Sequence, residues 1–378
     1  MNAKEASKRI FSISNKNQHK IISILGLKLK FKKQNTKKDD IKIKFDKLNK
    51  ELKTTKNEIK LLRAIIEKSI DITKVPPAKG NLRKVQLIKT KVLDLVDVIL
   101  KKHNIQYWLD FGTLIGAVRH QGFVPWDNDI DVSILRDDYL KLPQIFDKEL
   151  SYFNNPDLHF AYGSPKGSEL IRFYYKNFCV DFFPYEFINK RLNSQDEKEE
   201  FIKKWAKVRE KMLKKFPLDN FKNGTMTHLD IIEDVAKIKN EIFKNNYCIN
   251  KDSKQLIRMV ETMFLQKNCG VIEYDDIFPL QNLQFENLLL PAPNNPIESL
   301  HAHNMYGKKG SIMTFPKITD SGFKHTQATY EDSKDDFDEI YNRLSEIVKD
   351  YKTNNQNQVL NFERERVKNA LISLKLCA

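Results

Sequence analysis

Cysteine is scarce in this sequence of 378 residues: there are four, and no two of them form a C-x-x-C pair. Structural zinc sites are usually built from such pairs, so a zinc-stabilised fold is disfavoured. The four residues are Cys179, Cys248, Cys269 and Cys377. Scattered cysteines of this kind are typical of reduced thiols, and we therefore expect a cytoplasmic protein.

Long apolar runs are also missing. No stretch approaches the roughly 18 apolar residues that a helix needs to cross a bilayer. The basic N-terminus lacks the apolar core of roughly 7–15 residues and the small-residue cleavage site that mark a secretion signal, so none is expected. The length of the chain leaves room for two or three domains.

Positive charge is distributed unevenly along the chain. Residues 1–80 hold 22 Lys and Arg against 8 Asp and Glu, whereas the remaining residues hold 43 against 42. An enzyme that acts on nucleic acid more often carries its basic stripe on the domain that performs the chemistry. We therefore predict no nucleic-acid partner, and little affinity for nucleic acid once residues 1–80 are deleted.

The first 38 residues contain eleven Lys and Arg and a single acid. Between residues 27 and 32, Leu and Phe alternate with Lys, which predicts a strand with one basic face. Two interpretations stay open for residues 1–38. In the first, they contact an anionic membrane surface, where each basic residue contributes ~1 kcal/mol to binding, and the protein would lie peripherally at the inner membrane. In the second, they form a solvated basic extension.

A heptad pattern follows the basic segment. Its positions are Phe45, Leu48, Leu52, Thr55, Ile59, Leu62 and Ile66, with one polar defect at Thr55. The spacing predicts a short coiled-coil helix through which copies of the chain associate across residues 45–66; the alternative is a single amphipathic helix packed on the body. Two prolines then break the helix. We divide the chain into a basic segment, a coiled-coil helix, a linker, a main domain and C-terminal helices, at 1–40, 41–74, 75–81, 82–320 and 321–378.

The pattern of the main domain predicts an α+β fold. We expect a helix over 82–103, a strand over 105–109, and a turn with a short helix over 110–119. A second strand is expected over 129–134, and a hairpin over 171–183 with its turn at Lys176-Asn177. Ser194 and Glu197 form a capping box that opens a helix ending near residue 215. Residues 225–268 look mainly helical, 274–316 are rich in loops, and two helices close the chain around 334–351 and 359–376.

Three acids alternate in the stretch GFVPWDNDIDVSI, residues 122–134. If residues 129–134 form a strand, Asp129 and Asp131 share one face with Ser133, while the intervening apolar residues enter the core. Two carboxylates on one face repel unless a cation lies between them, and Mg²⁺ (or Mn²⁺) prefers such oxygen ligands. The alternative is a pair of solvated acids. Asp127 precedes the predicted strand, so we give it and Trp126 supporting roles.

A further acid, Asp181, lies in the otherwise apolar stretch FCVDFF. A buried carboxylate requires a partner, and the cation held by Asp129 and Asp131 would be one. We therefore predict Asp181 as a metal ligand or as a general base. A pair with Arg172 and a structural hydrogen bond remain open as alternatives.

Gly112 and Thr113 stand between a predicted strand and a predicted helix. A glycine there lets a phosphate approach the backbone, and Thr113 would cap the helix and hold phosphate oxygens. Arg119 and His120, at the end of the same helix, add positive charge near a phosphate or form an ordinary basic pair on the surface.

The twenty residues from Gly112 to Asp131, GTLIGAVRHQGFVPWDNDID, resemble the LicD family, which includes the fukutin-related proteins. The family pattern is close to GTLLGAxRHxGFIPWDDDID. The later motifs VDFFP, FPL, FE, PNN and YG follow the order of the family, at 180–184, 278–280, 285–286, 293–295 and 306–307. The resemblance covers roughly residues 82–320.

This resemblance implies a nucleotidyltransferase-like mixed sheet flanked by helices, and a metal-dependent transferase. Such enzymes move a phosphorylated alcohol, such as phosphocholine or ribitol phosphate, from a CDP-linked donor to a sugar hydroxyl of a surface glycan. Carried over to this sequence, the family roles fall in three groups. Residues that would hold Mg²⁺ are Asp129, Asp131 and Asp181; those contacting the diphosphate are Gly112 and Thr113; further phosphate contacts are Arg119 and His120.

Asn128 departs from the family pattern, which has aspartate there. Because it lies between Asp129 and Asp127, the strand alternation directs it to the other face, and we expect it to spare metal binding. Two other functions stay open: a nucleotidyltransferase that acts on a small molecule, and an inactive scaffold. His301 and His303 suggest zinc only weakly, since no other ligand pair lies near them in the sequence.

Overall fold

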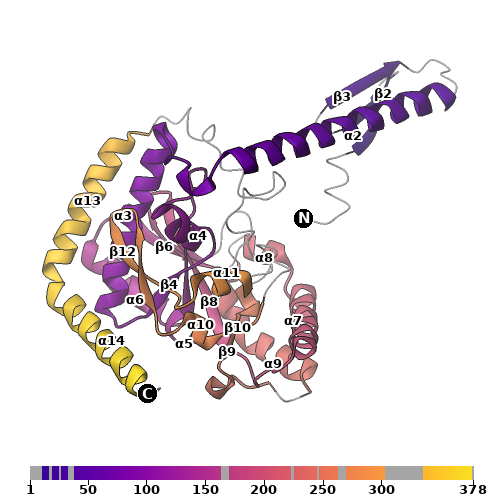
Figure 1. Cartoon of the computed structure of the whole chain (residues 1–378). Helices are drawn as coiled ribbons and strands as arrows, with labels where there is room; N and C mark the ends of the chain where they lie inside the picture. Colours follow the sequence, from indigo (N-terminus) through magenta and orange to yellow (C-terminus); the bar gives the residue numbers. More distant parts are fainter. Residues whose placement is uncertain are drawn as a thin grey trace. The chain divides into compact units, whose positions relative to one another are not determined.

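The computed structural model of the chain describes residues 11–16, 19–24, 27–32, 38–162, 170–222, 225–244, 247–262, 270–302 and 335–376 (Figure 1). Features that lie outside the described residues are Cys269, His303, Tyr306, Gly307 and Cys377, together with parts of the basic segment and of the stretch 225–268. The chain divides into two units, residues 1–70 and 71–378.

The first unit combines a small sheet with one long helix. Its antiparallel strands are β1 (Phe11–Lys16), β2 (His19–Ile24) and β3 (Leu27–Lys32). The strand predicted from the Leu/Lys alternation is thereby confirmed. Helix α2 (Lys38–Ser69) contains the whole heptad stretch, and three seam residues, Phe45, Ile59 and Leu62, have exposed side chains.

The second unit is built on a mixed sheet of seven strands. Its central strand, β8, pairs in parallel with β5 on one side, and β7 and β9 pair with successive parts of its other side. Strand β6 extends the sheet beyond β7, β4 beyond β5, and β10 beyond β9. The strands are β4 (Tyr107–Leu109), β5 (Asp131–Leu135), β6 (Leu158–Tyr162), β7 (Ile171–Tyr175), β8 (Phe178–Phe187), β9 (Gln255–Arg258) and β10 (Ile272–Glu273).

One face of this sheet is covered by helices. Helix α3 (Gly80–Lys102) packs on β8, and α13 (Phe337–Asn354) and α14 (Gln356–Leu376) pack on α3 (Figure 1). The helix predicted over residues 82–103 is thereby confirmed, and its apolar residues explain this packing, because Val85, Val92 and Ile99 are fully buried in the main core. The mixed sheet flanked by helices confirms the predicted α+β class.

The remaining helices and a hairpin complete the unit. The capping box at Ser194 and Glu197 is present and opens α7, as predicted. The hairpin β11–β12 packs near β4 and α4. These elements are α4 (Phe111–His120), α5 (Arg136–Tyr139), α6 (Leu142–Phe153), α7 (Gln195–Lys215), α8 (Leu218–Lys222), α9 (Ile232–Ile242), α10 (Tyr274–Ile277), β11 (Gln281–Phe285), β12 (Leu288–Ala292) and α11 (Pro296–Ala302).

Two regional expectations need correction. The stretch 225–268, predicted as mainly helical, does contain α9, but it also contributes β9, which lies between β8 and β10. Four residues are too few to show a period that separates strand from helix. The stretch 274–316, predicted as loops because of its prolines, contains the hairpin β11–β12. Pro291 is accommodated there because a two-stranded sheet leaves every strand at an edge.

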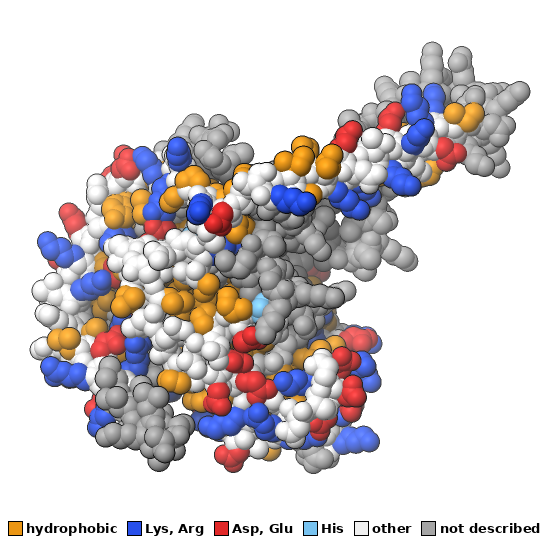
Figure 2. Space-filling model, in the orientation of Figure 1, with side chains coloured by type: hydrophobic (Ala, Val, Ile, Leu, Met, Phe, Trp, Pro, Cys, Tyr) orange, Lys and Arg blue, Asp and Glu red, His pale blue; other side chains and the backbone are white. Residues whose placement is uncertain are grey.

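Within the described residues, no helix has the length and apolar character needed to cross a membrane. On the face shown in Figure 2, acidic and basic side chains are interspersed over the second unit and are not gathered by sign. This distribution agrees with the nearly balanced charge of residues 81–378.

Candidate active site

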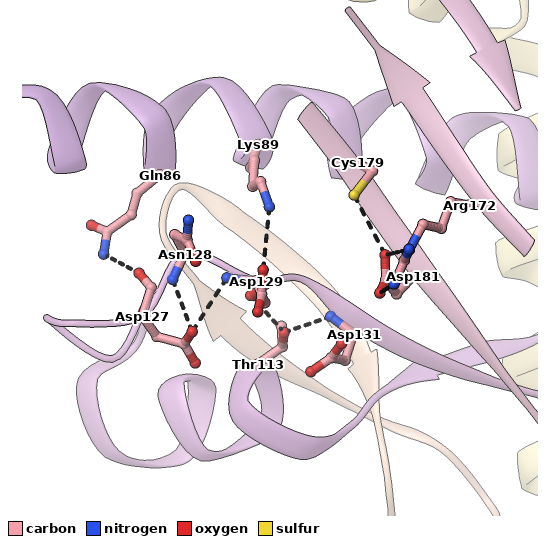
Figure 3. Close-up of polar contacts among 10 residues, drawn as sticks. All are labelled: Gln86, Lys89, Thr113, Asp127, Asn128, Asp129, Asp131, Arg172, Cys179 and Asp181. Carbon is pink, nitrogen blue, oxygen red and sulfur yellow. Dashed lines mark hydrogen bonds and ion pairs between the residues drawn. The ribbon is translucent and has the colours of Figure 1, made fainter. Parts of the chain in front are cut away.

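The sheet brings the predicted acids together. In the parallel pair β5–β8, Asp131 lies directly opposite Asp181, so both side chains stand on the same face of the sheet. The loop between α4 and β5 adds Asp127 and Asp129 beside them (Figure 3). Asp110, the residue after β4, donates its backbone N–H to the Asp131 carbonyl at 3.2 Å. Five carboxylates from four segments therefore surround one end of β5.

Asp131 is the electrostatic centre of this group. Its pKa is raised well above the usual range, first because burial disfavours the charged form and then because negative charge surrounds it. The charges responsible are those of Asp181, Asp129, Asp127 and Asp110, in decreasing order. A cluster of this kind is relieved by binding a cation.

Asp127 lies against the helix that precedes it. Its Oδ1 accepts backbone N–H groups of Asn128 at 2.8 Å and Asp129 at 3.3 Å. A Cβ added at Gly112 would lie 2.6 Å from Asp127 Oδ2. The absence of a side chain at Gly112 therefore leaves room for the Asp127 carboxylate in this position, independently of any phosphate. Burial and the neighbouring Asp129 raise the pKa of Asp127 to about 6.

Thr113 has a different role from the predicted cap. Helix α4 is capped by Asp110, whose Oδ1 accepts the Phe111 N–H at 2.8 Å. The Thr113 hydroxyl accepts the Asp131 N–H at 2.8 Å and approaches the Asp129 carbonyl at 3.4 Å. Thr113 is buried, and it fixes the backbone that presents the two acids.

Asp181 forms the pair with Arg172 that was one of the open alternatives. Arg172 Nε and Nη2 donate to Oδ1 and Oδ2 of Asp181, both at 2.7 Å, across the antiparallel pair β7–β8. The Cys179 thiol also contacts Asp181 Oδ1, at 3.4 Å. Because the guanidinium engages both oxygens, proton abstraction by Asp181 requires this pair to open.

The strand expected over residues 129–134 begins at Asp131, two residues late. Ile130, Val132 and Ile134 are buried in the main core, as the alternation predicts. Asp129 stays in the loop, where half of its side-chain surface (52%) is exposed. Ser133 is fully buried and donates a hydrogen bond to Asp110 Oδ2 at 2.6 Å.

Arg119 and His120 lie beside Trp126. The Arg119 Nε donates to His120 Nε2 at 2.9 Å, and its guanidinium carbon lies 5.7 Å from the centre of the Trp126 ring. Burial lowers the pKa of Arg119 to about 10, and burial together with Arg119 lowers the pKa of His120 to about 4. Arg119 is buried, so the alternative of an ordinary surface pair is wrong for it.

Lys89 is a site residue that the sequence reasoning missed. It comes from α3, is almost completely buried, and places Nζ 3.6 Å from Asp129 Oδ1 (Figure 3). Gln86, one turn earlier, donates to the Asp127 carbonyl at 2.7 Å. The sequence could have indicated this role, because Lys89 and Gln86 are polar residues on the same face of the helix as the apolar Val85 and Val92.

The donor set fits a hard divalent cation. All five acids offer oxygen ligands, which suit Mg²⁺ or Mn²⁺, and the raised pKa of Asp131 reflects negative charge that such an ion would neutralise. Among the described residues, no three His, Cys, Asp or Glu side chains are already arranged around a metal position. A cation shared by Asp131 and Asp181 would require side-chain rotation, including release of Asp181 from Arg172. His301 lies on α11.

Comparison with known proteins addresses the sequence resemblance. Residues 104–228 match the family model described as LicD/FKTN/FKRP, nucleotidyltransferase domain. Over these residues the chain is similar to the LicD family. The match contains Gly112, Asp131 and Asp181, and it is shorter than the resemblance seen over residues 82–320.

Individual relatives match this chain over short stretches. Lipopolysaccharide cholinephosphotransferase LicD of Haemophilus influenzae is 44% identical over 71 residues, 19% of this chain and 27% of the relative. The protein RP689 of Rickettsia prowazekii is 53% identical over 47 residues, 12% of this chain and 18% of the relative. Ribitol 5-phosphate transferase FKRP of Homo sapiens is 42% identical over 40 residues, which are 11% of this chain and 8% of the relative. The chain thus spans about a quarter or less of the length of these relatives.

The Asp127→Asn substitution tests the electrostatic repulsion within the cluster of acids. The pKa of Asp127 is about 6 in the folded protein against an ordinary 3.8. The folded state therefore binds the Asp127 proton more tightly than the unfolded state does. The free energy of unfolding falls as pH rises from about 4 to 6, and it stays low above pH 6. Asparagine keeps the acceptor oxygen without the charge. Without metal, we expect the variant to match the wild type at pH 4 and to be more stable at pH 8, by at most about 3 kcal/mol. A lower melting temperature than wild type at pH 8 would contradict this.

The Asn128→Asp substitution restores the residue of the family pattern. Asn128 is buried, and its side chain is directed toward α3 while the Asp131 carboxylate points the other way (Figure 3). We expect Mg²⁺ affinity, measured by titration calorimetry, to change by less than about threefold, since that is under 1 kcal/mol. A tenfold gain would show that position 128 faces the metal.

Proposed function

We propose that the chain is a Mg²⁺-dependent phosphotransferase, which moves a phospho-alcohol from a CDP-linked donor to a sugar hydroxyl of a cell-surface glycan. The observation that carries the proposal is the adjacency of Asp131 and Asp181 on β5 and β8, with Asp127 and Asp129 beside them. The relatives add chemical direction, because one is named a cholinephosphotransferase and another a ribitol 5-phosphate transferase. Both names describe transfer of a phosphorylated alcohol.

In this proposal Asp129, Asp131 and Asp181 hold the cation. A bound Mg²⁺ supplies positive charge that offsets the charge of the diphosphate and of the leaving CMP. Lys89 keeps the Asp129 carboxylate oriented, and the Thr113 hydroxyl fixes the backbone between Asp129 and Asp131. These contacts set the position of the ligands before the substrate arrives.

The α4 turn and its last residues contact the phosphates in this proposal. Gly112 and Thr113 offer the backbone of a helix N-terminus, which favours anions. Arg119 is a buried cation on the same helix, held by Trp126 and by neutral His120. These residues would hold the donor so that the reacting phosphorus faces the acceptor hydroxyl.

The reaction forms a bond from the acceptor oxygen to the phosphorus of the transferred group and breaks the bond from that phosphorus to the bridging oxygen of the diphosphate. CMP leaves with the bridging oxygen. The proton of the acceptor hydroxyl passes to a nearby carboxylate, for which Asp181 is suited once Arg172 has moved away. Arg172 then becomes available to a phosphate oxygen.

The product identifies the reaction. We expect incubation with Mg²⁺ and a panel of CDP-alcohols, including CDP-choline and CDP-ribitol, to release CMP in the presence of a glycan acceptor. Release of pyrophosphate from CTP and a small phosphorylated molecule, without CMP release from any CDP-alcohol, would instead establish a nucleotidyltransferase. An inactive scaffold would give neither product, and no thermal shift with Mg²⁺ or Mn²⁺ and CDP.

Residues 1–38 and α2 bear on where the protein is located and on its association with a second copy. We propose that the protein is cytoplasmic, that residues 1–38 contact the anionic inner membrane surface, and that α2 associates with a second copy. The apolar seam residues Ile59 and Leu62 are exposed on α2. In a two-stranded coiled coil, such seam residues pack against the helix of the second copy.

Light scattering after gel filtration tests the association. We expect the wild-type mass to be a whole multiple, two or more, of the monomer mass of 44.4 kDa. The Ile59→Lys/Leu62→Lys variant should elute as a monomer. Lysines at two seam positions place charge in the interface, where desolvation disfavours it. The matched control is Lys60→Gln, which leaves the seam unchanged. A monomeric wild type would reject the association.

A further inference from the structure

Arg258 is a buried cation on the face of the sheet that carries the acids. It is the last residue of β9 and lies opposite Tyr185 of β8, four residues beyond Asp181. Residues of even separation on one strand, and paired residues on adjacent strands, point to the same face. Arg258 therefore shares a face with Asp181 and Asp131. Only 3% of its surface is exposed.

The guanidinium of Arg258 has one edge unused. Within the part of the chain that the structure describes, no group accepts a hydrogen bond from Nε or Nη2, although both atoms are buried. Leaving a buried donor without an acceptor destabilises the folded protein, so an edge of this kind is usually occupied in the working protein.

The two unused atoms form a matched pair. Nε–H and one Nη2–H of a guanidinium point in parallel, which matches the two oxygens of a carboxylate or a phosphate. Arg172 uses these same two atoms, Nε and Nη2, to hold both oxygens of Asp181. Arg258 thus presents the geometry that binds a two-oxygen anion.

Two aromatic rings hold the guanidinium of Arg258 near the candidate site. Its central carbon lies 5.8 Å from the centre of the Phe111 ring and 5.9 Å from that of Phe183. Phe183 is two residues from Asp181 on the same face, and Phe111 precedes Gly112. The side chain of Arg258 therefore extends back from the end of β9 toward the acids and the α4 turn.

The position of Phe111 is itself fixed. Its φ of 47° lies in the left-handed region, which is unfavourable for a residue with a side chain. The hydrogen bond from its N–H to Asp110 and the packing of its ring on Phe183 at 4.5 Å maintain this conformation. The turn that places Gly112 thus also places a face of the Arg258 guanidinium.

We propose that Arg258 binds a phosphate of the nucleotide donor through two parallel hydrogen bonds from Nε and Nη2. The assignment rests on the proposed function, because it takes the donor to be a CDP-linked compound. A phosphate fits the position better than a neutral group, since a buried guanidinium edge gains most from a charged acceptor. Arg258 is absent from the resemblance motifs and follows from the geometry alone.

Nucleotide binding by the full-length protein tests this assignment. We expect Arg258→Lys to weaken binding of CDP in the presence of Mg²⁺ by about 10–100-fold in titration calorimetry, because lysine keeps the charge but loses the paired donors. Binding of cytidine, which has no phosphate, should stay within twofold of wild type. The matched control is Arg191→Lys, which alters a partly exposed arginine paired with Glu273 at 3.2 Å and should leave both affinities unchanged.

A second variant separates binding from folding. Arg258→Met removes the unsatisfied donors, so the ligand-free variant should melt at the wild-type temperature or above while its stabilisation by CDP is lost. A purely structural arginine would give a lower melting temperature and an undiminished shift with CDP. Arg258→Lys with unchanged CDP affinity, or with equal losses for CDP and cytidine, would overturn the assignment.

The outcomes for Arg258 and for the proposed function are distinct. Wild-type release of CMP from a CDP-alcohol, together with normal CDP binding by Arg258→Lys, would reject the assignment alone. Loss of CDP binding in Arg258→Lys, with no CMP release by the wild type from any CDP-alcohol, would reject the proposed reaction and retain the phosphate contact. A wild-type protein that does not bind CDP would reject both.

Discussion

Replacement of Asp131 by asparagine is expected to lower the rate of CMP release by about 10³-fold or more without unfolding the protein. Asp131 lies between Asp181 on the adjacent strand and the acids of the preceding loop, so it is the carboxylate best placed to share a cation with both. Asparagine retains the shape but supplies a weaker, neutral ligand. The transition state would then lose much of the charge stabilisation that the cation provides.

The folded state should tolerate this change. The raised pKa of Asp131 shows that its negative charge is unfavourable in the metal-free protein, so removing the charge should not lower the melting temperature at pH 8. The control is Asp137→Asn, on the neighbouring α5, where the carboxylate is mostly exposed and pairs with Lys251. Wild-type turnover by Asp131→Asn would remove the basis of the metal site, whereas reduced turnover by Asp137→Asn would point to a general effect of charge.

The second large effect is expected on folding, at Gly116. A Cβ at this position would lie 2.3 Å from the Gly122 carbonyl oxygen and 3.1 Å from the Val124 nitrogen. Both are backbone atoms, so relief requires α4 to separate from the loop that leads to the acids. We expect Gly116→Ala to lower the free energy of unfolding by about 3 kcal/mol or more in urea titration.

Gly112→Ala provides the comparison for Gly116. The Cβ at Gly112 would meet the end of the Asp127 side chain, which can rotate, so the loss of stability should be smaller. Activity should fall because Asp127 is displaced from the cluster. Equal unfolding free energies for Gly116→Ala and wild type would show that the close approach of α4 and the loop is not required.

Local structure followed from the sequence where short-range physics decides it. The hairpin β7–β8 formed around its predicted turn at Lys176 and Asn177, and the box at Ser194 and Glu197 opened α7. The alternation at residues 130–134 predicted which side chains enter the core. These features depend on turn chemistry, capping and periodicity, all of which are visible within a few residues.

Contacts between distant segments did not follow in the same way. The alternation suggested that Asp129 and Asp131 act together, but only the parallel register shows that Asp131 lies directly opposite Asp181. Lys89 is separated from Asp129 by forty positions, and its role depends on how α3 packs over the sheet. Arg258 was hidden in a four-residue strand that resembled part of a helix.

Glu286 shows how a recognised motif can conceal a structural role. Its carboxylate accepts two hydrogen bonds from Arg83, at 2.8 and 2.5 Å, and one from the Phe123 N–H at 3.0 Å. It therefore joins the β11–β12 hairpin to α3 and to the loop before the acids. The sequence identified the motif, but the pairing of positions 83 and 286 required the fold.

The most direct test of the account is the position of Mn²⁺ in crystals of the protein grown with Mn²⁺ and CDP, located by anomalous scattering. We expect a peak about 2 Å from carboxylate oxygens of Asp129 and Asp131, with a diphosphate oxygen in the same coordination shell. We also expect Asp181 to have left Arg172 to reach the ion. A metal bound away from β5, or a nucleotide bound with the Asp131 carboxylate vacant, would contradict it.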